Sequence, residues 1–219
     1  MKSLARTLLK RPAWLYACVS ALAVLVMAAT SAIFAPQLQQ WEERLSSRTW
    51  ALADSSATER RVVVVDIDEK STQALGAWPW PRDRMAQLLN GLDAYGVNLK
   101  VVDVLFDGEQ NPAQDTKLVE ALQANKAPTV ISQLFALSPD AQVKSGQLAS
   151  ASSIAATANT TCPAASTQAF GFMAAAPIFA QSTQAVGHIT PVVDPDGNIR
   201  RVPAVVCYEG KAYPALAIA

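Results

Sequence analysis

The sequence predicts an α/β fold in which an N-terminal transmembrane helix precedes a mixed sheet of the βαβαβ type, with helices and a C-terminal β-hairpin. Three observations lead to this prediction. Residues 12–35 carry no charge. Further along, runs of β-branched residues alternate with segments of helical period, which is typical of parallel strands joined by helical crossovers. Near the end of the chain, two apolar segments flank Asp194–Asn198, a sequence that suits a tight turn.

The composition excludes several classes of function. The 219 residues leave room for one membrane anchor and one sizeable domain. Basic and acidic residues number 18 each, so the chain offers no basic surface for nucleic acid, and we expect no nucleic-acid partner. His188 is the only histidine, which argues against zinc, and neither a glycine-rich phosphate loop nor a nucleophile elbow occurs. We therefore expect no catalytic residue, no metal, no cofactor and no enzymatic activity in this chain.

The first predicted element is a membrane anchor over residues 12–35. As a helix this segment would cover about 36 Å, enough to cross a hydrocarbon core of about 30 Å. Residues 1–11 contain four basic side chains, and no acidic residue precedes Glu42, which predicts a cytoplasmic N-terminus. The rest of the chain would then lie outside a bacterial inner membrane, in the periplasm or extracellular space. A cleaved signal peptide is the alternative, although its apolar run usually has only about 7–15 residues.

Residues 36–60 are predicted to form a juxtamembrane helix and linker. Leu38, Trp41, Leu45 and Leu52 recur at close to helical spacing, with polar residues between them. Such a helix could pass motion between the membrane and an outer domain, or it could simply pack on that domain. The outer domain itself is predicted to span residues 61–219.

The outer domain opens with a predicted strand and helix. Val62–Ile67 is an almost continuous run of β-branched residues, which favours a strand covered on both faces. A polar strand end follows. The next helix should have Pro81 in its first turn and Gly96 at its C-terminal stop.

Two further strands continue the alternating pattern. Leu99–Phe106 and Thr129–Phe135 are apolar runs of strand length. Between them, Asp115 is the expected N-cap of a helix that ends before Pro128. This order predicts a parallel sheet with right-handed crossovers.

A long insertion is expected at 138–168, where Ala, Ser, Thr and Gln dominate without a period. Cys162 in this insertion and Cys207 in a later strand are both on the predicted outer side, where disulfides persist. We predict that they form a disulfide closing a loop of about 45 residues. Two unpaired thiols are the alternative. Cys18 lies in the anchor.

The last part of the chain should be mostly strands. Gly187–Val193 and Ile199–Val206 are predicted to form a hairpin around Asp194–Asn198. Glu209–Lys211 offers another turn, and we expect Tyr213 to begin a helix. The pattern at the end of the sequence favours a chain that continues.

Three carboxylates are candidates for a ligand site. Asp66 and Asp68, two residues apart at the end of a predicted strand, should point to the same side. Asp103 on the neighbouring strand could join them at the edge where α/β folds usually bind ligands. Together they could hold Mg²⁺ or Ca²⁺, or pair with Arg82. Alternatively, Asp66 caps the turn at Ser71, and Arg82 neutralises Asp68 or Asp103.

The segment Trp78–Arg82 has two interpretations. Aromatic rings and an arginine can form the wall of a ligand site or a partner interface, or they can close one end of the core. An Asp-x-Asp motif after a strand also resembles hydrolases of the haloacid dehalogenase class. Here, however, Glu69 and Lys70 replace the small residues expected after the second aspartate.

Three stretches closely resemble the CHASE type 2 sensory domain: residues 62–106, residues 187–206 and the closing Ala212–Ala219. The order of tip, anchor and domain matches that family as well. The resemblance implies an extracytoplasmic sensor, followed by further membrane helices and a cytoplasmic cyclase, histidine kinase or serine/threonine kinase output. The family's recurrent residues map here onto Asp66, Asp68, Ser71, Trp78, Pro79, Trp80, Pro81, Arg82, Asp103 and Phe106.

Two functions follow as hypotheses. One is a sensory input module that passes a small-molecule or protein signal through the membrane. The other is a structural, dimerising or envelope-protein-binding module without a small-molecule ligand. The expected partners are the membrane, a second copy of the chain in a homodimer, and an unidentified signal. The candidate ligand-binding residues are Asp66, Asp68, Ser71, Trp78, Trp80, Arg82 and Asp103.

Overall fold

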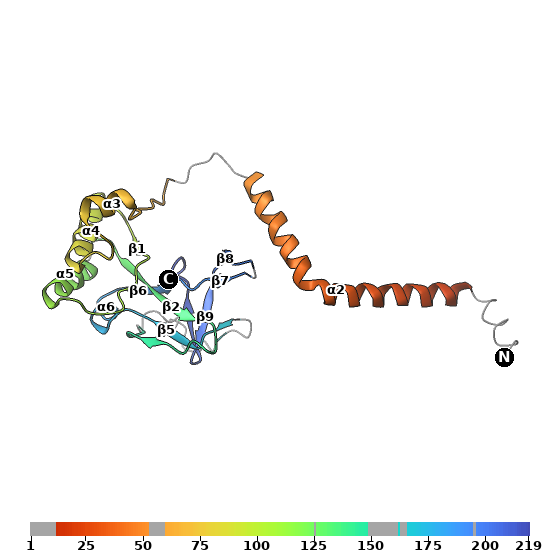
Figure 1. The fold of residues 1–219 in the computed structure, drawn as a ribbon. Helices are drawn as coiled ribbons and strands as arrows, with labels where there is room; N and C mark the ends of the chain where they lie inside the picture. Colours follow the sequence, from red (N-terminus) through yellow and green to blue (C-terminus); the bar gives the residue numbers. More distant parts are fainter. Residues whose placement is uncertain (1–11, 53–59, 125, 149–161, 163–165, 195) are drawn as a thin grey trace. The chain divides into compact units, whose positions relative to one another are not determined.

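The computed structural model describes residues 12–52, 60–124, 126–148, 162, 166–194 and 196–219 (Figure 1). These residues belong to two compact units, one within Met1–Val64 and the other spanning Val65–Ala219. Each unit is described separately below. Most of the predicted insertion at 138–168 lies outside the described residues.

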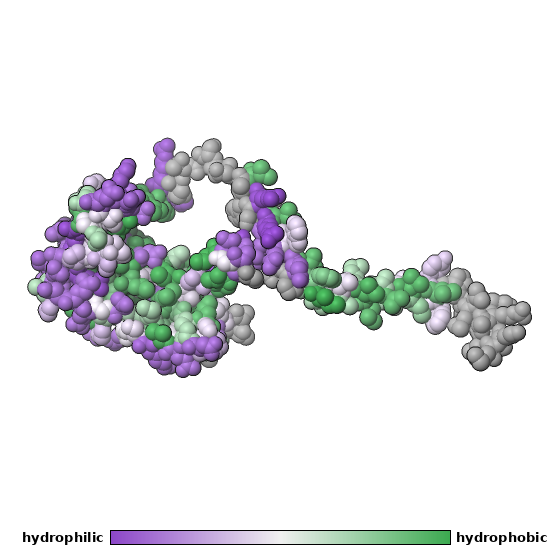
Figure 2. Space-filling view, viewed as in Figure 1, coloured by the Kyte–Doolittle hydropathy of each residue, from purple (hydrophilic) through white to green (hydrophobic). Residues whose placement is uncertain are grey.

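The first unit is built on one helix, α2 (Pro12–Leu52), which runs for 41 residues. Its segment Trp14–Ala35 has a mean hydropathy of 2.2 and, among the described residues, is alone in being long and apolar enough to cross a membrane by length and composition. Figure 2 shows hydrophobic side chains along this stretch and mostly hydrophilic ones on the remainder of the helix. The Thr30 hydroxyl donates to the Val26 carbonyl at 2.9 Å, so this polar group is satisfied within the helix itself.

The segment Val62–Ile67 forms no strand and joins no sheet among the residues that the structure describes. Val63 and Val64 are 80% and 86% exposed. The prediction of a first strand is therefore wrong here. Branching at Cβ favours an extended backbone, but a strand also needs a neighbour that satisfies its backbone hydrogen bonds.

Two helices follow this segment. α3 (Glu69–Leu75) occupies a place where the sequence predicts a polar strand end. α4 (Arg82–Ala94) begins after Pro81, which stands at the N-cap rather than inside the first turn. Gly96 follows the end of α4 with φ at 71°, a backbone conformation that glycine adopts without strain, so the predicted stop is confirmed.

A parallel ladder of three strands forms the centre of the second unit. β2 (Thr129–Ala136) lies between β1 (Lys100–Val102) and β6 (Ala185–His188) and pairs in parallel with both. β1 is shorter than predicted because the chain beyond it turns away from β2. The Phe106 carbonyl accepts instead from the Ala176 N–H at 2.8 Å.

The helix between β1 and β2 is α5 (Pro112–Gln123). Its N-cap is Asn111, whose side chain accepts from the Ala113 N–H at 3.0 Å, and proline follows at the first helical position. Asp115, the predicted cap, lies one turn inside, where its buried carboxylate accepts from the Gln110 N–H at 2.9 Å. The predicted start is therefore wrong, because Asn followed by Pro is the stronger start signal.

The second half of β2 pairs with a different strand. Leu134–Ala136 is antiparallel to β5 (Gly171–Met173), which in turn pairs in parallel with β3 (Lys144–Ser145). The short helix α6 (Pro177–Ala180) comes just after β5. β2 therefore belongs to a parallel ladder at its start and to an antiparallel pair at its end.

Hairpins complete the C-terminal part. β7 (Val192–Val193) and β8 (Ile199–Arg201) pair around the predicted turn, where Gly197 has φ at 81°. β9 (Val205–Tyr208) pairs antiparallel with β10 (Lys211–Pro214) and parallel with β4 (Thr167–Gln168). Each predicted hairpin strand thus divides into two shorter ones. The predicted helix from Tyr213 is wrong, because β10 continues the sheet there.

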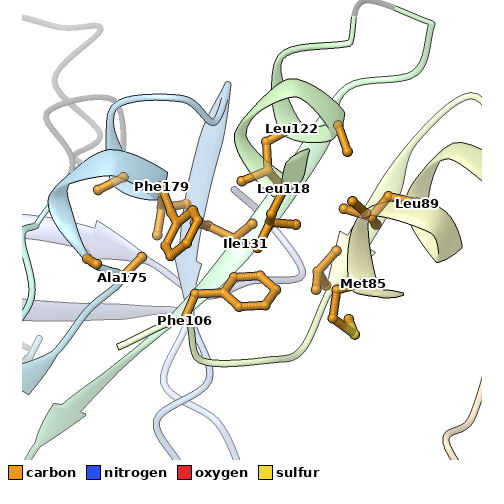
Figure 3. Packing of buried hydrophobic residues seen from close by; sticks show 14 of the residues in the cluster. Met85, Leu89, Phe106, Leu118, Leu122, Ile131, Ala175 and Phe179 are labelled. Atoms are coloured by element: carbon orange, nitrogen blue, oxygen red, sulfur yellow. The ribbon is translucent and has the colours of Figure 1, made fainter. Parts of the chain in front are cut away.

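Two apolar clusters lie within the second unit. The helix-side cluster joins α4, α5, α6 and the parallel ladder, and Figure 3 shows Phe106, Ile131 and Phe179 meeting at its centre. The hairpin-side cluster joins the end of β2 to β9 and β10; its buried members are Phe135, Ala169, Val206, Tyr208 and Tyr213. The predicted class, a mixed α/β fold with an N-terminal apolar helix and C-terminal hairpins, is confirmed.

Candidate functional site

Asp68 and Ser71 are brought together at the start of α3. The Asp68 Oδ1 accepts from the Ser71 hydroxyl at 2.7 Å and from the Ser71 N–H at 2.8 Å. These two hydrogen bonds hold the pKa of Asp68 below its usual range. Asp68, and not Asp66 as the sequence suggests, therefore caps this turn, while Asp66 is exposed on an unpaired segment.

The two tryptophans differ in their surroundings. Trp80 is only 5% exposed, and its indole N–H donates to the Gly76 carbonyl at 2.8 Å. Trp78 is 42% exposed and contacts Trp80 edge to face, with ring centroids 5.9 Å apart. Trp80 thus closes the core beside α4, whereas Trp78 leaves much of its ring available to a binding partner.

Arg82 is buried and stabilises the loop after β1. Its guanidinium lies over the Phe106 ring at 4.8 Å and the Phe179 ring at 5.6 Å. One Nη donates to the Gly108 carbonyl at 3.0 Å. Burial lowers the pKa of Arg82, opposed by the nearby carboxylates of Asp115 and Asp107.

The expected pairing of Arg82 with Asp68 or Asp103 is therefore wrong: its contacts come from the chain beyond β1 and from α6. Phe179 and Gly108 are partners that sequence inspection missed, and no local pattern points to them. Asp103 lies immediately after β1 and is exposed. Among the described residues, no hydrogen bond or ion pair joins Asp66, Asp68 and Asp103 to one another.

The candidate residues thus divide into two groups. Asp68, Ser71, Trp80 and Arg82 are engaged by partners inside the fold. Asp66, Trp78 and Asp103 are exposed. The first group fixes the backbone around α3, α4 and the loop after β1, while the second group is accessible to a ligand.

The predicted disulfide is present between Cys162 and Cys207. The two Cα atoms are 5.8 Å apart and the cysteines are separated by 45 positions, so the bond ties a distant part of the chain to β9. Cys18 in α2 is a free thiol. A disulfide in the second unit is consistent with an oxidising compartment outside the cytoplasm.

Ion pairs stabilise the turn between β7 and β8. Arg200 donates to the carboxylates of Asp194 at 3.0 Å and Asp196 at 2.9 Å. These bonds lower the pKa of Asp196 and raise that of Arg200. The backbone N–H of Asn198 also donates to the Asp196 carboxylate, at 3.1 Å, so the hydrogen bonds of this carboxylate stabilise the turn itself.

The sequence of the chain is similar to a known domain family. The model of the CHASE2 domain matches residues 20–219, nearly the whole sequence. No curated protein and no solved structure matches. The match covers all of α2 except its first eight residues, and the entire second unit, including every candidate residue discussed above. Such a domain acts as a non-catalytic sensor, and the chain therefore belongs to the CHASE2 family of extracellular sensory domains.

Proposed function

We propose that this chain is the sensory input module of a membrane-bound bacterial signalling protein. α2 anchors it in the inner membrane, with residues 1–11 in the cytoplasm and the second unit in the periplasm. The signal passes to a cytoplasmic cyclase or kinase output. The observation that carries this proposal is that α2 joins an apolar span and a polar extension in one uninterrupted helix ahead of a sensory domain.

The length of α2 supports transmission. The apolar segment Trp14–Ala35 has 22 residues, about 33 Å of helix, which suffices for a hydrocarbon core of about 30 Å. The remainder of the helix, residues 36–52, adds about 25 Å of polar helix outside the span. The backbone hydrogen bonding of α2 continues from the apolar segment into this extension, although Figure 1 shows a bend between the two parts, so a movement of the extension can reach the segment in the membrane.

The exposed candidate residues supply a surface for the signal. Asp66 and Asp103 offer carboxylates and Trp78 offers an aromatic face. The neighbouring buried residues hold the backbone on which these groups stand. A ligand bound there would bias two states of the domain only by its difference in affinity for them.

Cysteine labelling tests the proposed orientation. In a Cys18→Ser background, Asp140→Cys places a thiol at an exposed position of the second unit. We expect a membrane-impermeant maleimide to label this thiol in intact spheroplasts. Lys2→Cys in the same background is the control and should be labelled only after lysis. The reverse pattern would place the second unit in the cytoplasm and contradict the proposal.

Thermal unfolding of the whole chain in lipid nanodiscs tests ligand sensing. A ligand present at about 100 times its dissociation constant stabilises the folded state by about 2.7 kcal/mol, which is visible as a higher Tm. We expect a hit from a panel of divalent metals and small metabolites that Asp103→Asn or Asp66→Asn abolishes. Asp140→Asn, another exposed aspartate, is the matched control and should keep the response. If neither Asp103→Asn nor Asp66→Asn changes the rise in Tm, these two carboxylates do not bind the ligand.

A second candidate function, an assembly module that binds another copy of the chain, is favoured by one observation. Val62, Val63, Val64 and Val65 are 68%, 80%, 86% and 53% exposed, and such a run is a common interaction element. In a Cys18→Ser background, Val63→Cys should then form a disulfide-linked homodimer in membranes. Gln87→Cys, at an exposed position of α4, is the control that should remain monomeric.

A further inference from the structure

β2 changes partners near its middle. Its parallel pairing with β1 ends where Ile131 lies opposite Val102, and its antiparallel pairing with β5 starts where Leu134 lies opposite Met173. In a strand, the backbone N–H and C=O groups of successive residues point to opposite edges, so Gln133 and Ala136 face different neighbours. The Gln133 carbonyl accepts from Ile189, on the β6 side, whereas the Ala136 carbonyl accepts from Phe170. β5 therefore takes over the same edge that β1 leaves, and Gln133 lies where the two diverge.

Gln133 and His188 are neighbours at this point. They are register partners in the parallel pair of β2 and β6, so their side chains lie on the same face of the sheet. Both side chains are fully buried. They stand between Ile131 of the helix-side cluster and Phe135 of the hairpin-side cluster. A polar pair therefore separates the two apolar cores.

The polar atoms of this pair lack partners. Among the described residues, neither the Oε1 nor the Nε2 of Gln133 has a hydrogen-bond partner, and the same holds for the Nε2 of His188. The His188 Nδ1 accepts from the Thr190 N–H at 3.3 Å. In the neutral imidazole this bond places the proton on Nε2, which is then an unused donor. Burial lowers the pKa of His188 to about 4, so the ring is neutral at pH 7.

An occupant is expected on energetic grounds. Leaving a buried donor or acceptor unsatisfied costs more than a typical hydrogen bond gains, and native folds rarely leave three such atoms on two paired residues. The pair also lies near the C-terminal ends of two of the parallel strands, β1 and β6, and α/β folds bind ligands at such strand ends where strands diverge.

We propose that Gln133 and His188 form a binding site for a small neutral carboxamide. The primary amide of Gln133 presents a donor beside an acceptor, and a second amide presents the complementary pair. The ligand's N–H donates to the Gln133 Oε1, and its carbonyl accepts from the Gln133 Nε2 and the His188 Nε2. A charged ligand is disfavoured, because the pair is neutral and a buried ion needs an opposite charge. This site is distinct from the exposed carboxylates and does not depend on the proposed transmembrane signalling.

The test uses acetamide and the whole chain in nanodiscs with ¹⁵N-labelled glutamine. The side-chain NH₂ signal of Gln133 is assigned by its loss in Gln133→Met, which has similar shape without the amide. We expect acetamide to shift this signal saturably and to raise the Tm of the wild-type chain. Acetate, with nearly the same shape but a charge, and N,N-dimethylacetamide, without an N–H, should give no saturable shift.

The outcomes separate cleanly. Saturable binding of acetamide that His188→Phe weakens at least tenfold supports the proposal. A shift that grows linearly with concentration, or equal effects of the three probes, overturns it and leaves ordered water as the occupant. The rise in Tm is measured on the wild-type chain and needs no signal assignment, so the comparison of the three probes by Tm remains decisive even if Gln133→Met folds poorly. The test of the carboxamide site is independent of the test of the proposed function. If Asp103→Asn had no effect on the Tm response to a ligand, the result with acetamide would still stand.

Discussion

Lys100 and Asp93 form an ion pair at 2.8 Å in which the two side chains are only 1% and 3% exposed. The pair links the first residue of β1 to the last turn of α4. Two buried charges are stable only together, since each alone would have lost its water without gaining a partner. The contact therefore fixes how α4 packs against the start of the sheet.

Removing one member of this pair should be costly. We expect Asp93→Leu or Lys100→Met to lower the free energy of unfolding by about 3–5 kcal/mol, because the remaining charge stays buried. The double variant should recover most of this loss, since it leaves no charge behind. Denaturant titration followed by circular dichroism measures all three. A double variant as unstable as the sum of the singles would contradict the interpretation.

Arg82 should matter mainly for stability. Arg82→Ala removes the hydrogen bond to Gly108 and the stacking on Phe106, and we expect a loss of about 2–4 kcal/mol in the free energy of unfolding. Arg82→Lys should rescue little, because lysine lacks the planar group. Arg84, a partly exposed neighbour whose guanidinium lies over Trp80 at 5.9 Å, is the matched control. If Arg84→Ala lowered the free energy of unfolding as much as Arg82→Ala does, the buried contacts of Arg82 would not be the cause of its larger expected effect.

His188 should make the second unit sensitive to acid. Its pKa in the folded chain is about 4, against 6.5 in the unfolded chain, so between these values the unfolded chain binds the extra proton. Stability should therefore be complete above pH about 6.5 and fall by up to about 3 kcal/mol as the pH drops to 4. The measurement is Tm against pH for the wild type and His188→Gln. If both chains lose stability in parallel over this interval, His188 is not the group that titrates.

The disulfide should stabilise the fold in an oxidising compartment. It closes a loop of 45 residues, which in the chain-entropy model contributes about 4 kcal/mol. Cys162→Ser with Cys207→Ser should lower the Tm, and a reductant should have the same effect on the wild type alone. Cys18→Ser is the control and should leave Tm unchanged. A double variant that still responds to reductant would point to another bond.

Much of the fold could be predicted from local sequence. The apolar span, the stop at Gly96, the turn at Gly197 and the β2 strand each depend on properties of a few consecutive residues. The paired cysteines were also predictable, since two thiols in one exported domain favour a bridge. Val62–Ile67 shows the limit of such reasoning. Its β propensity is real, but whether a neighbouring strand accepts it is decided by tertiary structure.

The candidate site was only partly predictable. Asp68 was named, but its partner Ser71 makes it a helix cap, and α3 is too short to give a clear period. The environment of Arg82 depends on Gly108 and on Phe179, which lies almost a hundred positions away, and no spacing rule connects them. Gln133 was not singled out because a lone glutamine in an apolar strand has no recognisable pattern. Its significance comes from His188, which only the pairing of β2 with β6 places beside it.

Because β2 pairs with β1 and β6 and also with β5, it affects how the second unit unfolds. Any fluctuation that detaches β2 from β1 and β6 also loosens its pairing with β5, because the same backbone takes part in both. The helical half and the hairpin half are therefore one cooperative unit and should not melt separately. Amide hydrogens of β6 and of β5 should exchange with solvent at similarly slow rates, through the same global opening.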